Sequence, residues 1–495
     1  MRKLQLSSLF VFLLFFQTIG FGKEGQSFDQ KSVEKLKWTV VKLEVANRYG
    51  LDTDFPYSGS GTGFIVDKQR GIVVTNRHVV TASPLTKLKI NFYNNKSVDG
   101  KVLYIDPWHD FAFVQFDPKD KNIDFSLSQV ELGSQKDVHE GDEVLLIGHS
   151  SGADYSVKSG TINKKLIKIG PVPSERHSHH IHVSLPRAGG ASGAPLWNVD
   201  KKVIGLHSAG KDNESYEVRI DYIRDALETI QKGKMPTRGD VFVLLDAIQL
   251  FRAKEGYDLP ENYVTKGVLE NSNFHYAILI SKLIQGTEAY KKLQVGDFII
   301  GIRGSREKNM FQLGYSLYDF DRIVNQNVGG KVILSVYRQN KNNGKSFDIE
   351  LTVHDANQYI PNRFAILSGA VFQDVTPSLS FRYNWPLDGV YLNSALNGSS
   401  FSSLASSLKD EYGDLTDEKA VLIKKIDGIE VHNLDDFIRI MKPFKDGEVL
   451  NVCISDMQSY FTGDVNDVVY LSIITDPLKM YVKDRKLKKW VEDKI

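Results

Sequence analysis

Cysteine is almost absent from this chain, since Cys453 is the only one among 495 residues. A single cysteine excludes an intramolecular disulfide, so the fold must be stabilised by its hydrophobic cores. Net charge is also lacking, because 62 basic residues stand against 61 acidic ones. This balance gives no indication of a nucleic-acid partner. The length predicts about three units of roughly 100 to 200 residues each.

Long apolar runs are lacking as well, and a helix needs about 20 apolar residues to cross a bilayer. The apolar run at residues 9–16 is shorter and follows Arg2 and Lys3, while Gly20 and Gly22 come after it. This order is typical of a secretory signal peptide at residues 1–22, with a membrane anchor as the alternative. We therefore expect export without stable membrane insertion. The bacterial periplasm or cell envelope is the expected location, and secretion is the alternative.

Short β-rich segments fill the region from residue 27 to 231, where glycine and polar turns separate them. Their shortness and frequency predict an all-β barrel or sandwich. A helical pattern at residues 221–231 ends this region, and the Lys, Gly, Pro and Arg residues at 232–239 indicate a linker. The clearest of the short segments are 63–66, 72–75, 112–116 and 144–147.

Two later segments share one order of features, which is typical of a weak internal repeat. In each, a strand and a tight glycine turn lead to a short strand, an amphipathic helix and a closing strand. The repeat predicts two copies of one small α+β module. Residues 479–489 are rich in lysine, and we expect a solvated helix or a frayed tail there. The first copy covers residues 293–304, 321–324 and 331–338, and the second covers 421–431, 434–441 and 449–455.

Three motifs in the β-rich region carry the residue types of a nucleophilic triad in the order His, Asp, Ser. His78 follows the strand pattern at 72–75, Asp110 precedes the apolar strand pattern at 111–116, and Ser192 lies between glycines. A serine hydroxyl needs an imidazole to take its proton, and a carboxylate must orient that imidazole. We predict Ser192 as nucleophile, His78 as general base and Asp110 as the orienting acid. Ser192 would come from a second half of the fold, and the site would lie in a cleft.

The glycines around Ser192 allow a tight turn that points backbone N–H groups inward. The N–H groups of Gly190 and Ser192 are the predicted oxyanion hole, whose loss typically lowers the rate by about 100- to 1000-fold per donor. The motif order argues against a lipase-like hydrolase, which requires the order Ser, acid, His and a Gly-x-Ser-x-Gly elbow. Ala194 stands where the second glycine of that elbow would be.

These motifs resemble the HtrA/Deg (DegP-like) serine proteases. The resemblance extends over nearly all of the first half and is nearest to the branch with the fungal nuclear HtrA-like proteases. It implies a mainly β, chymotrypsin/trypsin-like double β-barrel at 27–231, then PDZ or PDZ-like domains at 238–355 and 360–476 and a basic tail at 477–495. The matching motifs are Gly61-Thr62-Gly63-Phe64, Thr75-Asn76-Arg77-His78-Val79-Val80, His109-Asp110-Phe111 and Gly189-Gly190-Ala191-Ser192-Gly193.

The same resemblance implies that the strand at 204–209 lines the substrate main chain. Leu206, His207 and Ser208 are then the substrate-binding residues, with the first two near the primary pocket. Two positions depart from the family pattern. Phe242 stands where a PDZ peptide-capture loop has a small residue, and Ala188 to Ala191 replace the usual Asn-Pro-Gly-Asn. These changes put peptide capture by the first module and the setting of the oxyanion hole in question.

Two other clusters allow more than one interpretation. The histidines at 177, 179, 180 and 182 are predicted as a solvated loop that enters a strand, with pH-dependent tuning of the site or metal binding as alternatives. No carboxylate or cysteine with ligand-like spacing accompanies them, and we expect no metal or other cofactor. Tyr49, Phe55 and Tyr57 either cap the barrel or, as in HtrA proteins, make trimer contacts.

The motifs together predict a serine endopeptidase that cleaves unfolded or damaged proteins through an acyl-enzyme, in envelope protein quality control. The resemblance also implies a homo-oligomer, a trimer or a multiple of it, with unfolded proteins or peptides as substrates. The alternative is a catalytically weak or inactive HtrA-like chaperone that only binds unfolded chains. The altered residues before Ser192 keep that alternative open.

Overall fold

The fold is known from a computed structural model, which describes residues 28–493 with internal gaps. The predicted signal peptide, Phe55, Ala188 and Gly189 lie outside the described residues. In the part of the chain that is described, no helix is long and apolar enough to cross a membrane. The gaps are residues 55, 83–86, 151, 168–174, 186–189, 261–262, 264–275, 313–316, 340–343, 403–419, 446, 456–466, 474–477 and 485–488.

Six antiparallel strands form a closed first barrel after helix α1 (Gln30–Lys37). Alternating apolar residues direct one face of each strand inward, as in β1, where every second residue from Val41 to Val45 is buried. The short helix α2 (Arg77–Val80) follows β3 directly. In barrel order, the strands are β1 (Val40–Asn47), β2 (Tyr57–Asp67), β3 (Ile72–Thr75), β6 (Ala112–Gln115), β5 (Ser97–Ile105) and β4 (Lys87–Asn91).

A second six-stranded barrel is closed by pairing between its first and last strands, β11 and β12. β7 (Glu131–Leu132) adds to β12 in parallel, η1 (Gln135–Asp137) follows it, and α3 (Ile220–Gln231) ends the unit. One hydrophobic cluster joins both barrels, with Phe64 and Phe113 from the first and Trp197 from the second. The barrel order is β11 (Pro195–Asn198), β8 (Glu143–Ser150), β9 (Ala153–Ile167), β10 (His180–Ser184), β13 (Glu214–Arg219) and β12 (Lys202–Lys211).

The first C-terminal module, residues 239–359, is a sheet with helices beside it. Its core joins the sheet to α7 (Leu317–Gln326) through residues such as Phe320 and Leu334. The sheet order is β15 (Val243–Gln249), β16 (Tyr276–Leu283), β17 (Phe298–Gly304), β19 (Lys331–Arg338) and β20 (Lys345–Thr352), with β18 (Phe311–Gln312) on β17. The module also contains α4 (Leu250–Tyr257), α6 (Glu288–Lys292), η2 (Ala356–Tyr359) and the pair β14 (Gly239–Asp240) and β21 (His354–Asp355).

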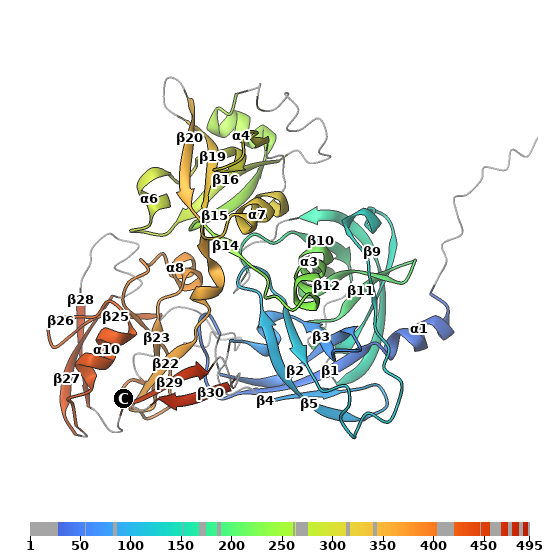
Figure 1. Ribbon diagram of the computed structural model, residues 1–495, viewed down its shortest axis with the longest axis horizontal. Coiled ribbons are helices and arrows are strands. Elements are labelled where there is room, and N and C mark those ends of the chain that lie inside the picture. The colour runs from blue at the N-terminus through green and yellow to red at the C-terminus, as the bar shows by residue number, and fades with distance from the viewer. Residues whose placement is uncertain are drawn as a thin grey trace, which may run out of the picture.

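The second C-terminal module, residues 363–493, is built on one long sheet that Figure 1 shows in orange and red. Its core packs α10 (Leu434–Met441) on the sheet through Phe437 and Phe372. The sheet order is β28 (Asp467–Ile473), β27 (Val449–Ser455), β25 (Val421–Ile426), β24 (Val390–Ala395), β23 (Ala370–Asp374), β22 (Arg363–Leu367), β29 (Lys479–Asp484) and β30 (Lys489–Asp493), with β26 (Ile429–Glu430) on β25. Helix α8 (Pro377–Tyr383) lies between β23 and β24 in sequence. The predicted mainly β class with two α+β modules is confirmed.

The prediction of a solvated helix or frayed tail at the C-terminus is wrong. β29 and β30 form a hairpin that extends the sheet of the second module at β22. Tyr481 stacks on Phe364 with ring centroids 5.0 Å apart, and Trp490 lies 5.3 Å from the same ring. Lys479, Lys483 and Lys489 are exposed on these strands, while Tyr481 and Trp490 are partly buried against Phe364.

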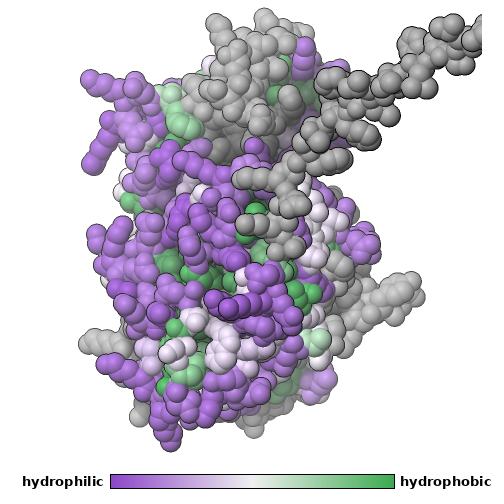
Figure 2. Space-filling model, turned by 90° about the vertical axis from the view of Figure 1, so that its right-hand side faces the viewer, coloured by the Kyte–Doolittle hydropathy of each residue, from purple (hydrophilic) through white to green (hydrophobic). Residues whose placement is uncertain are grey.

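The predicted aromatic cluster is divided between two environments. Tyr49 packs against Phe364 of the second module with ring centroids 5.7 Å apart, so its contact lies within the chain. Tyr57 is 41% exposed on β2, and its trimer contact stays a prediction. Figure 2 shows a mostly hydrophilic face of the molecule on which hydrophobic residues occupy small, separate areas.

Candidate active site

His78 and Asp110 lie side by side on the first barrel, at the ends of adjacent strands β3 and β6. The His78 Nδ1 atom is 2.7 Å from Asp110 Oδ2, and the His78 backbone N–H donates to Oδ1 at 3.0 Å. The Asn76 side chain donates to the Asp110 backbone carbonyl at 2.9 Å, which is a further bond between the segment after β3 and the segment before β6. The carboxylate therefore holds both the ring and the backbone of His78.

A fourth residue, Ser208 on β12, donates its hydroxyl to Asp110 Oδ2 at 2.7 Å. Burial alone would raise the pKa of Asp110, but the charge of His78 and the hydrogen bonds from His78 and Ser208 hold the pKa below its ordinary value. Asp110 is fully buried, so these contacts keep its negative charge directed at the imidazole. The second barrel thus contributes to the orientation of the acid.

The turn that leads to Asp110 is fixed by another buried carboxylate, Asp106. Its Oδ1 atom accepts the backbone N–H groups of Trp108 and His109 at 2.9 and 3.0 Å. Its Oδ2 atom accepts from Arg238 Nε at 2.6 Å. Burial would raise the pKa of Asp106, but the charge of Arg238 lowers it below its ordinary value. Arg238 precedes β14, so the linker between the protease region and the first module holds this turn.

Ser192 lies in a glycine turn of the second barrel that packs against β2 of the first. The Ser192 carbonyl accepts the Thr62 N–H at 2.8 Å, and the Thr62 hydroxyl donates to the Gly190 carbonyl at 3.0 Å. Gly193 has φ +89°, and a Cβ there would lie 1.9 Å from the Thr62 carbonyl oxygen. Only glycine fits at that position, so the flanking glycines let the serine turn approach the other barrel.

Among the described residues, no hydrogen bond links the Ser192 hydroxyl to His78, although the His78–Asp110 bond is formed. Catalytic contacts of this kind are often loose without substrate and tighten when it binds. Ala188 and Gly189 of the predicted oxyanion loop lie outside the described residues. Gly190 is described, with φ +90°. The catalytic roles and the oxyanion hole remain predictions that this arrangement supports.

The three predicted substrate-binding residues have different surroundings. Leu206 is 0% exposed and packs in the barrel core, so its side chain cannot line a substrate pocket. His207 is buried beside Glu217, with Nδ1 3.1 Å from Oε2, and its main chain accepts the Gly193 N–H at 2.9 Å. Ser208 bonds to Asp110 instead of lying open to substrate. The Ser208 contact has no signal in the sequence, because it joins β12 of the second barrel to the turn before β6 of the first.

The histidine cluster is buried, so its prediction as a solvated loop is wrong. His177, His179 and His180 are at most 1% exposed. His177 lies 3.1 Å from Asp321 of α7 through Nδ1, and its Nε2 accepts the Leu245 N–H of β15 at 3.2 Å. The ring also stacks on Trp108. His177 therefore joins the segment before β10 of the second barrel to the first module.

Within the described ranges, no group of three or more His, Cys, Asp or Glu residues is arranged to hold a metal ion. His180 Nε2 instead lies 3.1 Å from Glu175, and His182 stacks on Tyr216 with centroids 5.1 Å apart. Each of these imidazoles thus has its own neighbour. The alternative of pH-dependent tuning stays a prediction.

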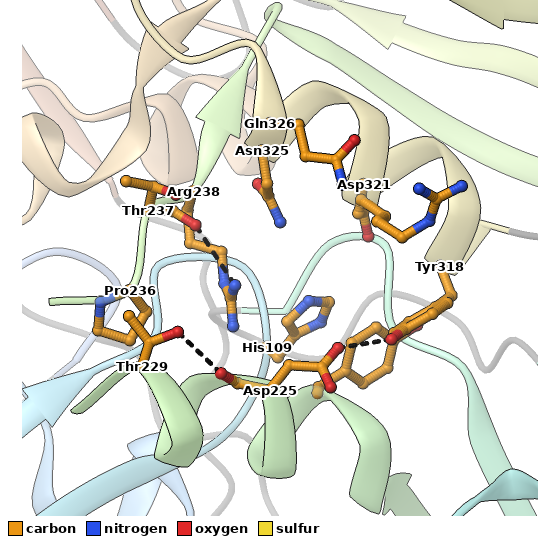
Figure 3. Close-up of a pocket in the computed structure, with 12 residues that line it drawn as sticks. His109, Asp225, Thr229, Pro236, Thr237, Arg238, Tyr318, Asp321, Asn325 and Gln326 are labelled. Atoms are coloured by element: carbon orange, nitrogen blue, oxygen red, sulfur yellow. Dashed lines mark hydrogen bonds between the residues drawn. The ribbon is translucent and has the colours of Figure 1, made fainter. Parts of the chain in front are cut away.

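A cavity of about 320 Å³ lies behind this site, between α3, the linker and α7 (Figure 3). His109, the neighbour of Asp110, lies among the residues that line it, and Arg238 and Asn325 point into it. Tyr318 donates to Asp225 at 2.5 Å across its lower edge. Neither His78 nor Ser192 lines this cavity, so it is not the cleft where the reaction would occur.

The pH dependence of proteolysis should be set by the protonation of the His78 imidazole. Burial lowers the pKa of His78, but the charge of Asp110 and its hydrogen bond outweigh burial and raise the pKa above 6.5. The general base must be neutral, so kcat/KM is low below this pKa and rises as pH increases through it. A profile of kcat/KM between about pH 5 and 9 should have its acid midpoint above 6.5. A midpoint below that value would contradict the assignment.

Replacing Gly190 with alanine should lower kcat by roughly 10- to 100-fold, because the turn must shift away from the oxyanion position. The added Cβ would lie 2.6 Å from the His149 carbonyl oxygen, at φ +90°. Gly152→Ala is a matched control, since Gly152 also has φ +90° but no atom within 4 Å of an added Cβ. Equal losses in steady-state kcat for the two variants would show that backbone strain alone, and not the position of this turn, limits the rate.

Two family models match parts of the chain. Residues 61–206 match a trypsin-like peptidase domain, and residues 359–447 match a PDZ-like domain. The first match contains His78, Asp110 and Ser192. The second covers most of the second module up to α10.

Curated relatives align with most of this chain at 28% identity. The pro-apoptotic serine protease nma111 of Aspergillus oryzae is 28% identical over 426 residues, which cover 84% of this chain and 38% of that protein. NMA111 of Saccharomyces cerevisiae is 28% identical over 431 residues, which cover 86% of this chain and 40% of that protein. This chain therefore spans about two fifths of the length of these relatives.

The solved structures with similar folds include the HtrA-type protease AlgW with a tripeptide. It is 18% identical, has a TM-score of 0.49, and the match covers 65% of this chain and 95% of that chain.

Proposed function

We propose that this chain, whose trypsin-like peptidase domain is followed by a PDZ-like domain, is an HtrA-type serine protease that cleaves unfolded or damaged proteins. Ser192 attacks the peptide carbonyl while His78 takes its proton, and an acyl-enzyme forms as the amine leaves with that proton. Water then releases the acyl group by the same route. The observation that carries the proposal is the His78–Asp110 pair at 2.7 Å, on the barrel against which the Ser192 turn packs through Thr62.

Digestion of a model protein by the purified mature chain tests this proposal. Casein, or a reduced and unfolded protein, should be cut at many sites, while the folded form of the same protein should be cut slowly or not at all. Mass spectrometry then maps the cut sites. Equal cutting of folded and unfolded forms would contradict the preference for unfolded chains, and no cutting of either would contradict proteolysis.

Binding without cleavage is the second candidate function, and one observation favours it. Ala188 to Ala191, directly before Ser192, replace the usual Asn-Pro-Gly-Asn of HtrA proteins. An active-serine phosphonate probe separates the two functions, because it labels only an activated serine. Labelling that is lost in His78→Ala supports the protease, and absence of labelling in the unmodified chain supports the binding protein.

The cellular location of the proteolysis is also part of our proposal. Export through the predicted signal peptide at residues 1–22 would bring the enzyme to the bacterial envelope, where we propose that it takes part in protein quality control. Fractionation of cells that produce the full chain tests this location. A chain that stays in the cytoplasm at full length would contradict it.

The structure of the first module argues against peptide capture by this module. Phe242 is 5% exposed, with φ +58°, and packs against Ile284 and Phe381. The Leu245 N–H, a strand-edge donor that an added peptide would need, already donates to His177. We therefore propose that unfolded substrates reach the protease without being held at this edge of the sheet.

We also propose that the chain forms a trimer or a multiple of it. Analytical ultracentrifugation measures this oligomeric state.

A further inference from the structure

Arg77, the residue before His78, is a buried charge at the centre of the catalytic region. It is 1% exposed, and its Nη2 atom lies 2.5 Å from Asp52 Oδ2. Its Nη1 atom donates to the carbonyls of Asp106 and Pro107 at 3.3 and 3.4 Å. Asp106 and Pro107 begin the turn that carries Asp110. One guanidinium therefore joins the helix of the general base to the turn of its orienting acid.

The partner of Arg77, Asp52, is held by the second C-terminal module. The other carboxylate oxygen of Asp52 accepts the hydroxyl of Thr376, the residue that caps α8. The Asp52 N–H donates to Gln373 Oε1 of β23 at 2.8 Å. Asn393 of β24 donates to the Asp52 carbonyl at 3.3 Å. Three side chains of a module more than 300 residues away in sequence thus fix this one aspartate.

The surroundings make this connection costly to break. The side chains of Arg77 and Asp52 are 1% and 3% exposed, so neither charge can turn to water when its partner is lost. Asp54, two residues away, is also buried and accepts the Ala82 N–H at 2.9 Å. Burial raises the pKa of Asp54 to about 6, and the charge of Arg77 opposes that rise. Arg77 therefore pairs directly with Asp52, and its charge also acts on the neighbouring carboxylate of Asp54.

We propose that Arg77 is a positioning residue for the His78–Asp110 pair, and that the second module sets its position through Thr376 and Asp52. This inference rests on the proposed proteolytic function. The described contacts of Arg77 are all inside the protein, so it acts on the rate through His78 and Asp110 without touching substrate. The second module is then part of the catalytic scaffold, whatever peptides it binds.

A double-mutant cycle on the full mature chain tests the proposal, with Arg77→Met and Thr376→Val. Each change should lower kcat by about 10-fold or more and leave KM unchanged, because a buried charge loses a hydrogen-bonded partner and the reacting groups shift. The double variant should lose little more than Arg77→Met alone, since both act through Asp52. Multiplied losses in the double variant would overturn the proposal, because they would mean independent structural effects.

Two conservative variants and one control make the result specific. Thr376→Ser keeps the hydroxyl and should have the kcat of the unmodified chain. Arg77→Lys keeps the positive charge but loses the several N–H donors of the guanidinium, so its kcat should lie between those of Arg77→Met and the unmodified chain. Thr161→Val changes an exposed threonine of β9 and should leave kcat unchanged. Equal kcat for Thr376→Ser and Thr376→Val would overturn the role of the hydroxyl. Melting curves of every variant show which losses come from unfolding.

A measurement without turnover separates failure of this inference from failure of the proposed function. The proton between His78 Nδ1 and Asp110 gives a low-field proton NMR signal, which Ser192→Ala should retain. In that background, Arg77→Met and Thr376→Val should each shift or broaden the signal, and Thr161→Val should not. An unmoved signal in both variants overturns the positioning role even if the chain cleaves nothing.

Discussion

Replacing Ser192 with alanine is expected to lower kcat by about 10⁴- to 10⁶-fold, the largest effect of any single change in this chain. The alanine removes the nucleophile and leaves the His78–Asp110 pair and the glycine turn intact. The turn is held by backbone bonds, with the residue-192 carbonyl accepting the Thr62 N–H at 2.8 Å, so the fold should not change. Steady-state cleavage of an unfolded protein measures the loss.

The control for this variant is Ser58→Ala, which removes an exposed hydroxyl of β2 and should leave kcat unchanged. The Ser192→Ala chain should show the same melting temperature and circular dichroism spectrum as the unmodified chain. Proteolysis at a wild-type rate in Ser192→Ala would end the assignment of the nucleophile. Residual activity near 10³-fold over water is still expected, because binding and oxyanion stabilisation remain.

Replacing Asp110 with asparagine is expected to lower kcat by roughly 10⁴-fold, because the imidazole takes the wrong tautomer. Asp110 Oδ2 lies 2.7 Å from His78 Nδ1, and an ionised carboxylate can only accept hydrogen bonds, so Nδ1 must carry the proton. An amide can place its NH₂ group there and force Nδ1 to become the acceptor, so Nε2 carries a proton and cannot take one from Ser192. Single-turnover kinetics at neutral pH measure the loss.

The pH profile distinguishes this mechanism from general loss of structure. The charge of Asp110 raises the pKa of His78 against burial, so its removal should move the acid midpoint of the remaining activity to lower pH. Asp124→Asn removes an exposed carboxylate of the same domain, which pairs with Lys96 at 3.3 Å, and should change neither kcat nor the midpoint. A variant Asp110→Asn with near wild-type kcat would contradict the role of Asp110.

Much of the fold class and of the triad could be predicted because both depend on residue patterns within short segments of the sequence. Alternation of apolar and polar residues is a local property of a strand, and the barrels are built from such strands. The triad members lie at strand-to-turn junctions, and Ser192 also lies between the glycines at 190 and 193. The same local rules failed at residues 479–489, because Tyr481 in this segment and Trp490 just after it pack on Phe364, which lies far earlier in the sequence.

The surroundings of the triad could not be predicted in the same way. Ser208 bonds to Asp110 from another barrel, and Leu206, two positions earlier on the same strand β12, packs in the core. His177 was expected in solvent but lies between Trp108 and α7. A histidine or arginine is polar in every sequence scale, so only the partners that the fold brings to it decide whether it can be buried.

The sequence by itself determined the nature of the chemistry: which serine, histidine and aspartate are available, in which order, and beside which glycines. The tertiary structure alone decided what holds those groups in place, from Ser208 and Asp106 to the path from Arg77 through Asp52 to Thr376. The physical reason is that buried polar groups need partners within about 3 Å, and such partners come from segments whose distance in sequence carries no local signal.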